Sequence, residues 1–326
     1  MTSTYRKILV ALAALCLMFG LAACGDDEAD SGSTGDAATE DGGKAITKDP
    51  ANASKGTIAV GSKNFTEQFI LGEIYAQTLE AQGFKVRRRL NLGSEQVAYK
   101  ALKSGSIDMY PEYTGTALTS FFKVKTADVP KDADEAYEQA KAEYAKNNIT
   151  ALERTPFQNT FIIASTKATA DKADNPETVT DLFANNPDLS ISGFPECRQR
   201  EDCLLGLRSE YGFKGKFVSS DGKFSDLDGG QSDLTLAFST DPQLALTDKY
   251  VAYEDDKKFF PPYNITLAIR NDTVEKIGQE AVDTLVAVQE GMTEEAMREL
   301  NRRVELEKQE PKAVAAAFLK EEGFTE

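Results

Sequence analysis

The sequence contains no histidine at any of its 326 positions. A Ser-His-Asp triad and a Cys-His nucleophilic pair both require an imidazole, so neither can form in this chain. Histidine is also a frequent zinc ligand, and every metal site that depends on it is excluded as well. One missing residue type therefore removes a large part of hydrolytic and metal-dependent enzymology.

Positive charge is also scarce. Lysine and arginine number 37 against 53 aspartate and glutamate residues, which gives a formal net charge of -16 at pH 7. A surface that binds nucleic acid or an anionic membrane needs the opposite balance. The sequence therefore indicates no nucleic-acid partner.

The apolar run near the N-terminus is too short for a membrane span. It extends over residues 8–23 and follows two basic residues, whereas a transmembrane helix needs about 20 apolar residues. This pattern predicts a signal peptide over residues 1–23. Cys24 directly follows Leu-Ala-Ala, which resembles the bacterial lipobox, so Cys24 is predicted to be lipidated and to anchor the protein to the membrane. A single transmembrane anchor is the alternative.

Residues 24–55 lack large apolar side chains almost entirely and are rich in Gly, Asp, Ser, Thr and Ala. Such a segment cannot bury enough apolar surface to offset the entropy lost on ordering. We expect a flexible tether that holds the folded part of the chain away from the membrane.

Alternating strand and helix patterns begin at residue 56. Thr66 is expected to cap the first helix, which has an apolar stripe and ends before Gly83. The expected elements are a strand at 57–60, a helix from 66, a strand at 84–92, a helix at 94–103 and a strand at 107–110. This βαβαβ order predicts a parallel sheet with a crevice at its carboxyl edge, lined by Lys63, Tyr113 and Thr116.

A second set of elements follows a charged helix at 132–148 and a strand at 149–152. The expected elements are a crossover strand at 161–165, a helix near 180–183, a strand at 189–193, a helix at 204–211, a strand at 216–219 and a last strand that ends at Phe238. Residues 264–269 are apolar enough to re-enter the first sheet, and amphipathic helices after them should pack on the first lobe. We therefore expect two α/β lobes, residues 56–158 with 264–326 and residues 159–263.

A faint repeat relates the two lobes. Adding 125 to the residue number pairs Leu102 with Leu227, Gly105 with Gly230, Asp108 with Asp233, Tyr113 with Phe238 and Thr114 with Ser239. In each copy a helix ends at a glycine, a strand opens at an aspartate, and an aromatic and a hydroxyl residue stand where that strand ends. Ligands bind at such strand ends in α/β sheets, so both copies are expected to face one cleft.

Cys197 and Cys203 are separated by a polar loop of five residues. Outside the cytoplasm the two cysteines should be oxidised. Closing so small a loop stabilises a protein by only about 2 kcal/mol, so its expected purpose is local, to hold Arg198 or Arg200 in place. A metal site would need more ligands and a catalytic thiol would need a partner base. A disulfide is therefore favoured over both.

Four motifs, in this order, resemble those of the substrate-binding lipoproteins of osmoprotectant ABC importers, the OpuAC/ProX-like family. They are Gly61-Ser62-Lys63-Asn64-Phe65-Thr66-Glu67-Gln68, Pro111-Glu112-Tyr113-Thr114-Gly115-Thr116, Phe238-Ser239-Thr240-Asp241 and Pro261-Pro262-Tyr263. The resemblance covers residues 56–324. It implies the type 2 periplasmic-binding-protein fold, in which two α/β lobes close on glycine betaine, choline, carnitine or a related quaternary amine and deliver it to an ABC permease with its ATPase.

The resemblance also implies the site. The positions that match the family's aromatic box are Tyr113, Phe161, Phe238 and Tyr263. Those that match its carboxylate clamp are Lys63, Thr116 and Arg200, with Asn159 beside the box. Two of the box residues are Phe where the family mostly has Tyr, which leaves ergothioneine open as a ligand.

Other interpretations remain open from the residues alone. Phe161 and Phe238 could pack in a core, and Lys63 could be a solvated loop residue. An enzyme on the same fold would need a partner for Lys63, and the sequence offers no convincing one. A surface lipoprotein that senses or adheres is a third possibility. Glu112 would repel a ligand carboxylate and is expected to support its loop. We expect a binding protein that is not an enzyme and has neither metal nor cofactor.

Overall fold

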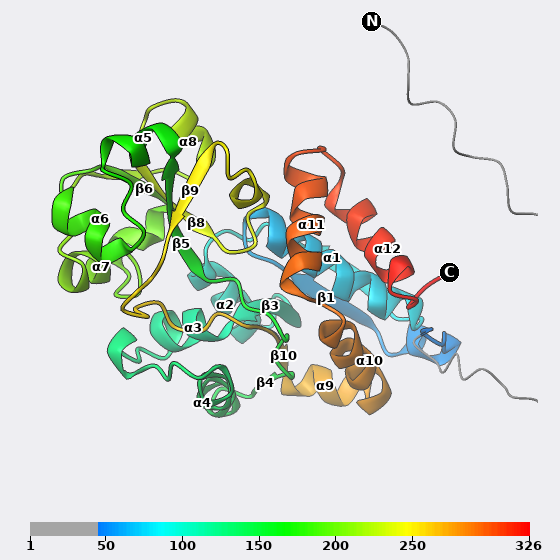
Figure 1. Cartoon of the computed structure of the whole chain (residues 1–326). Helices are drawn as coiled ribbons and strands as arrows, with labels where there is room; N and C mark the ends of the chain where they lie inside the picture. The colour runs from blue at the N-terminus through cyan, green and yellow to red at the C-terminus, as the bar shows by residue number, and fades with distance from the viewer. Residues whose placement is uncertain (1–44) are drawn as a thin grey trace, which may run out of the picture. The chain divides into compact units, whose positions relative to one another are not determined.

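The computed structural model describes residues 45–326, and the strands in that range form two five-stranded sheets (Figure 1). The first sheet has the order β2-β1-β3-β10-β4, with bounds Lys85–Arg89, Thr57–Gly61, Met109–Tyr113, Ile265–Arg270 and Ile149–Ala151. The second has the order β7-β6-β8-β5-β9, with bounds Phe217–Ser219, Ile191–Gly193, Leu234–Phe238, Phe161–Thr166 and Tyr250–Tyr253. Each sheet and the helices around it are called a lobe below.

The two sheets have the same topology. Strand β1 runs parallel to β2 and β3, and β6 runs parallel to β7 and β8. The fourth strand of each sheet is antiparallel to its neighbours: β10 pairs with β3 and β4, and β5 pairs with β8 and β9. The parallel βαβαβ start is confirmed, and so is the return of the chain to the first sheet after residue 264.

Helices cover both sheets (Figure 1). Their bounds are α1 Thr66–Ala81, α2 Glu95–Lys103, α3 Thr114–Thr116, α4 Ala133–Ala145, α5 Lys167–Lys172, α6 Val179–Asn185, α7 Leu204–Glu210, α8 Phe224–Asp228, α9 Asn271–Ile277, α10 Gln279–Glu290, α11 Glu294–Glu305 and α12 Pro311–Glu321. Short 3-10 turns lie at η1 Pro50–Ser54, η3 Thr126–Asp128, η4 Pro195–Gln199 and η5 Pro242–Ala245, and a π-helix, η2, spans Ala117–Phe121.

Helix α1 is buried on nearly all sides. Ile74 and Tyr75 are both fully buried although they point in different directions, because α10, α11 and α12 pack against α1 as well. The C-terminal helices therefore pack on the first lobe, as predicted. Phe65 is the N-cap of α1 and makes no side-chain cap bond, so the expected capping by Thr66 is wrong.

The 125-residue repeat is present in three dimensions. Asp108 Oδ2 accepts a hydrogen bond from the Ala59 backbone N (2.7 Å), and Asp233 Oδ2 accepts one from the Ser190 backbone N (2.8 Å). Each aspartate thus ties the start of its strand to the neighbouring parallel strand. The strands that follow, β3 and β8, end at Tyr113 and Phe238, which brings equivalent aromatic residues to the same edge of each sheet.

One strand was missed. The prediction made Phe238 the end of the last strand in the second lobe, but β9 follows and pairs with β5 at the sheet edge. Its four residues, Tyr-Val-Ala-Tyr, form a short apolar run, so the sequence did carry a strand signal here that the prediction did not use.

The chain before β1 contacts the first lobe. The Ile46 backbone N donates to the Phe324 carbonyl (2.9 Å), and Asn52 Nδ2 donates to the Gln82 carbonyl (2.8 Å). Residues 45–55 therefore belong to the folded part of the chain, and the predicted tether cannot extend to residue 55. The predicted signal peptide (1–23), Cys24 and most of the tether lie outside the described residues. In the described range, every helix is too short or too polar to cross a bilayer.

Candidate ligand-binding site

A cavity of about 570 Å³ lies at the carboxyl ends of the parallel strands of both sheets. Its wall includes all eight predicted ligand-binding residues: Lys63, Tyr113, Thr116, Asn159, Phe161, Arg200, Phe238 and Tyr263. Strand ends of α/β sheets are a usual place for ligands, because loops there can present side chains from several elements. The structure thus brings together residues that are up to two hundred positions apart in the chain.

Phe161 is the centre of an aromatic cluster in this wall. Its ring centroid lies 5.1 Å from that of Tyr263, 5.5 Å from that of Phe238 and 5.8 Å from that of Phe194. The sheet register explains the contact with Phe238, because Phe161, the first residue of β5, is opposite Phe238, the last residue of β8. The two Phe residues therefore pack together and line the cavity at the same time.

The cluster continues into the first lobe through Phe65, whose centroid lies 5.8 Å from Phe238 and 6.1 Å from Tyr113. Phe65 and Phe194 were not predicted as site residues. Each follows the carboxyl end of a strand, β1 or β6, which is the signal that could have identified them. We call the following residues the aromatic wall: Phe65, Tyr113, Phe161, Phe194, Phe238 and Tyr263.

Lys63 is buried in the turn after β1, not solvated. Its Nζ forms an ion pair with Glu112 Oε1 (2.5 Å) and lies 4.3 Å from the centroid of the Tyr113 ring. Burial lowers the pKa of the Lys63 ammonium, while the Glu112 carboxylate acts in the opposite direction. Glu112 also accepts bonds from the Tyr113 backbone N and the Tyr110 hydroxyl, so it supports the strand end that carries Tyr113.

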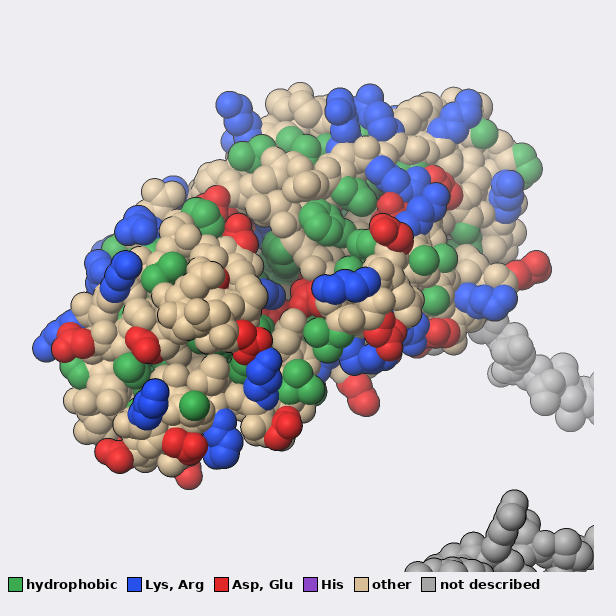
Figure 2. All heavy atoms as spheres, turned by 90° about the horizontal axis from the view of Figure 1, so that it is seen from above, with side chains coloured by type: hydrophobic (Ala, Val, Ile, Leu, Met, Phe, Trp, Pro, Cys, Tyr) green, Lys and Arg blue, Asp and Glu red, His purple; other side chains and the backbone are tan. Residues whose placement is uncertain are grey.

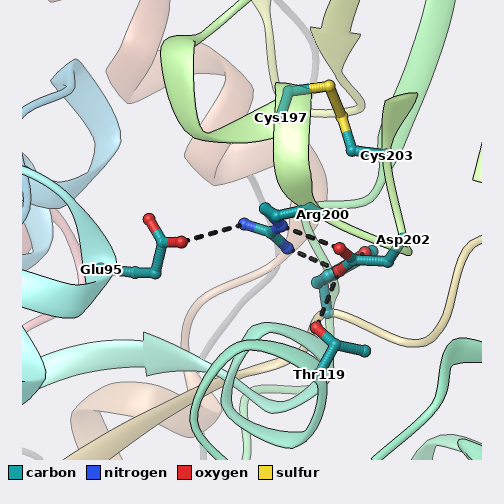
Figure 3. Close-up of a disulfide and its surroundings, with 7 residues drawn as sticks. Glu95, Thr119, Cys197, Arg200, Asp202 and Cys203 are labelled. Atoms are coloured by element: carbon teal, nitrogen blue, oxygen red, sulfur yellow. Dashed lines mark hydrogen bonds and ion pairs between the residues drawn. A yellow bond between two sulfur atoms is a disulfide. The ribbon is translucent and has the colours of Figure 1, made fainter. Parts of the chain in front are cut away.

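Arg200 enters the cavity from the loop that the disulfide closes. Its Nε and Nη2 bind Asp202 Oδ1 and Oδ2 at 2.8 and 2.5 Å, and its Nη1 lies 3.9 Å from Glu95 of the first lobe (Figure 3). The guanidinium carbon also lies 5.5 Å from the ring centroid of Phe161. Arg200 is thus held by a carboxylate and a ring before any ligand is considered.

Asp202 is fully buried and joins the two lobes. Besides Arg200, its Oδ2 accepts hydrogen bonds from the Tyr263 hydroxyl (2.7 Å) and from Thr119 Oγ1 (3.0 Å). Burial alone would raise the pKa of the Asp202 carboxyl. The charge and hydrogen bonds of Arg200 outweigh burial and hold that pKa below its ordinary value.

The predicted disulfide between Cys197 and Cys203 is confirmed (Figure 3). The loop it closes contains both Arg200 and Asp202, and of the two arginines in this loop Arg200 is the one that lines the cavity. Arg198 points elsewhere and lies 5.1 Å from the ring centroid of Phe217.

Glu67, the second residue of α1, is a buried carboxylate in the cavity wall. Its Oε1 accepts from the Tyr113 hydroxyl (2.7 Å) and Asn159 Nδ2 (2.9 Å), and its Oε2 accepts from Thr240 Oγ1 (2.6 Å) and Asn301 Nδ2 (3.3 Å). Burial raises the pKa of Glu67, and the four hydrogen bonds act against that rise. The sequence marked Glu67 only as part of a motif and gave it no role in the site, because its partners are far away in the chain.

Thr116 and Asn159 complete the predicted set. Thr116 lies in α3 and is 5% exposed. Asn159 donates to Glu67 through Nδ2, while its buried Oδ1 has no hydrogen-bond partner among the described residues. Asn159 therefore has an acceptor to offer at the cavity wall.

A second lysine reaches the cavity from the second lobe. Lys223 Nζ forms an ion pair with Asp241 Oδ1 (2.5 Å) and lies 5.1 Å from the ring centroid of Phe238. Lys63, Arg200 and Lys223 thus each have a carboxylate partner. On the molecular surface, Figure 2 likewise shows basic and acidic side chains interspersed.

A cavity lined by rings and paired charges, set between two α/β lobes of one topology, defines a class: the chain has the type 2 periplasmic-binding-protein fold of the solute-binding proteins. Residues 56–321 match the family described as the substrate binding domain of the ABC-type glycine betaine transport system. The chain belongs to this family.

Individual relatives agree with this membership. The "Ergothioneine transport permease/ergothioneine binding protein EgtU" of Helicobacter pylori is 31% identical over 281 residues, which cover 84% of this chain but only 49% of the relative. The "Glycine-betaine-binding protein" of Pseudomonas aeruginosa is 30% identical over 283 residues, with 81% and 88% covered. A solved structure described as a glycine betaine/carnitine/choline ABC transporter superimposes with a TM-score of 0.65 at 27% identity, covering 81% of this chain and 98% of that one.

Proposed function

We propose that this protein is the extracytoplasmic solute-binding component of an ABC importer and that it captures a quaternary amine with a carboxylate, such as glycine betaine or carnitine. The observation that carries the proposal is the aromatic wall around one cavity, with the buried cations Lys63 and Arg200 beside it. The names of the relatives, which include binding proteins for glycine betaine and ergothioneine, support the same ligand class.

The aromatic wall suits the ammonium end of such a ligand. A quaternary ammonium has no N–H to donate, so the negative faces of aromatic rings are its best partners, at about 2 kcal/mol for a desolvated contact. Tyr113, Phe161, Phe238 and Tyr263 would form the box, and Phe65 and Phe194 would extend it. Phe presents a ring face as Tyr does, so the two Phe residues keep this interaction.

The buried cations suit the carboxylate end. A lysine ammonium has three donors and a guanidinium has five. Lys63 uses one of its donors on Glu112, and Arg200 uses two on Asp202. Both residues therefore keep donors for a ligand carboxylate, and the hydroxyl of Thr116 can donate to it as well.

In this proposal binding closes the lobes and no bond of the ligand is broken. The first lobe (56–158 and 264–326) and the second (159–263) contribute contacts to one ligand, which favours the closed state. The closed protein would then deliver the ligand to a permease driven by an ATPase. Lipidation of Cys24 would hold the protein at the outer face of the membrane.

Calorimetric titration of residues 25–326 under oxidising conditions tests the ligand class. We expect micromolar or tighter binding of glycine betaine or carnitine and weaker binding of choline, which has no carboxylate. A preference for choline would contradict the clamp of Lys63 and Arg200. Absence of binding by all quaternary amines would contradict the proposed function, and conversion of a ligand during titration would indicate an enzyme.

Ergothioneine, a trimethylammonium carboxylate with a thioimidazole, is the second candidate. The H. pylori relative supports it by name, and the cavity, at about 570 Å³, has room for more than an eight-atom ligand such as glycine betaine. Including ergothioneine in the same titration decides between the two candidates.

A further inference from the structure

Both tyrosines of the aromatic wall donate their hydroxyl hydrogens to buried carboxylates. Tyr113 donates to Glu67 and Tyr263 donates to Asp202, each over 2.7 Å. A phenol that donates to an anion gains electron density in its ring, because hydrogen-bonded groups polarise one another in a low dielectric. Each bond therefore strengthens the attraction between that ring and a cation and places a negative charge at the hydroxyl edge of the ring.

The two carboxylates differ in what neutralises them. Asp202 forms a bidentate ion pair with Arg200. The four groups that donate to Glu67 are a phenol, a hydroxyl and two amides, and none of them carries a charge. The lysines of the cavity wall, Lys63 and Lys223, each form an ion pair with another carboxylate, and Lys223 acts on Glu67 only through a longer-range charge interaction.

Glu67 is thus a carboxylate only 2% exposed, without a cation in its hydrogen-bond shell. A buried charge without an opposite charge is costly, and a cation brought close to it offsets part of that cost. A quaternary ammonium is well suited to this, because it supplies charge but has no N–H that would compete with the four donors for the carboxylate oxygens.

We propose that Glu67 is the counter-charge for the cationic group of the ligand, acting from the cavity wall at the hydroxyl edge of the Tyr113 ring, and that it makes the site select a permanent cation over a neutral group of the same shape. This inference rests on the proposed function. It assigns Glu67 a specificity-determining role in addition to its contacts between the lobes.

The experiment compares two ligands of one shape. In glycine betaine the head group is trimethylammonium, and in tert-butylacetate a neutral tert-butyl group replaces it while the carboxylate remains. Choline and its tert-butyl analogue form a second pair. Titrations of residues 25–326 would give the affinity ratio within each pair for the wild type and for Glu67→Gln, Glu67→Asp and Glu73→Gln.

We expect Glu67→Gln to reduce the preference for the cationic member by about tenfold or more, as loss of a charge at close range in a low dielectric requires. Binding of the tert-butyl compound should stay the same or improve. Glu67→Asp keeps the charge and should keep the preference even if both affinities fall. Glu73→Gln is the matched control, since Glu73 is a buried carboxylate of the same helix that pairs with Arg88 outside the cavity, and it should leave the ratio unchanged.

Equal losses for both members of a pair in Glu67→Gln would overturn the inference and give Glu67 a purely structural role. The inference would also be overturned if Glu67→Asp lowered the affinity ratio of the cationic to the neutral ligand as far as Glu67→Gln does. These outcomes leave the proposed function intact, because the wild type would still bind the quaternary amine. If the wild type bound neither glycine betaine nor choline, the inference would be overturned, and so would the proposal that these two compounds are ligands.

Discussion

Arg200 and Asp202 form a bidentate ion pair within the loop that the Cys197–Cys203 disulfide closes. Arg200 faces the cavity, and Asp202 accepts hydrogen bonds from Thr119 and Tyr263. One short covalent loop therefore positions both a candidate ligand contact and a junction between the lobes.

Removing this disulfide should affect binding more than folding. We expect Cys197→Ser/Cys203→Ser to lower the free energy of unfolding by about 2 kcal/mol, as for a small loop. Affinity for the quaternary amine should fall about tenfold or more, because Arg200 and Asp202 lose their fixed positions. Denaturant unfolding and calorimetry measure the two effects. Wild-type protein with a reducing agent should behave like the variant, and unchanged affinity in both would contradict a positioning role.

Loss of Arg200 should discriminate between ligands. Arg200→Ala is expected to weaken glycine betaine far more than choline, because only betaine has a carboxylate. It should also destabilise the fold by about 3 kcal/mol, since Asp202 is left buried without its cation. The double variant Arg200→Gln/Asp202→Asn removes both charges and keeps polar side chains, so it should recover stability but not betaine affinity. Equal losses for the two ligands would remove Arg200 from the clamp.

The ring of Phe238 can be tested without disturbing polarity. Phe238→Leu keeps an apolar side chain but removes the ring face, and we expect quaternary amine affinity to fall by about 2 kcal/mol, or roughly thirtyfold. Phe238→Tyr, which restores the residue found at the equivalent position Tyr113, should keep most of the affinity. If leucine binds as well as phenylalanine, Phe238 is a packing residue and not part of the box.

The ion pair of Asp202 predicts an acid limit to stability. The pKa of the Asp202 carboxyl is lower in the folded protein than in the unfolded chain, where it is about 4. The stability that Asp202 contributes is therefore fully present above the unfolded-state pKa and is lost as the pH falls through the folded-state pKa. We expect the stability advantage of wild type over Asp202→Asn to be greatest near neutral pH and to disappear under strongly acidic conditions. Denaturant unfolding at a series of pH values measures this difference. A constant advantage at every pH would show that Asp202 does not titrate as proposed.

The sequence predicted the elements whose signals are local. The βαβαβ start, the repeat of Asp108 and Asp233 and the aromatic ends of β3 and β8 each depend on spacing within a short segment. For this reason Tyr113 and Phe238 could be assigned to one cleft before the structure was known.

Other features depend on distant pairing and gave no local signal. The donors to Glu67 are 46, 92, 173 and 234 residues away in the chain. The ion pair of Lys63 with Glu112 joins residues 49 positions apart, which is why the sequence offered no partner for this lysine. Burial of α1 on nearly all sides likewise follows from helices at the far end of the chain.

The insertion of the second lobe between β4 and β10 of the first has a consequence for biogenesis. All strands of the second sheet come from one continuous stretch, residues 161–253, so this sheet can be completed as soon as that stretch has emerged. Strand β4 of the first sheet pairs with β10, and next to this pairing Thr266 Oγ1 donates to the Leu152 carbonyl, which lies 114 residues earlier in the chain. Long-range pairings form slowly because the intervening loop must close first. The inserted lobe is therefore expected to fold before the lobe that surrounds it, and a chain that ends before β10 would leave the edges of β3 and β4 open to aggregation.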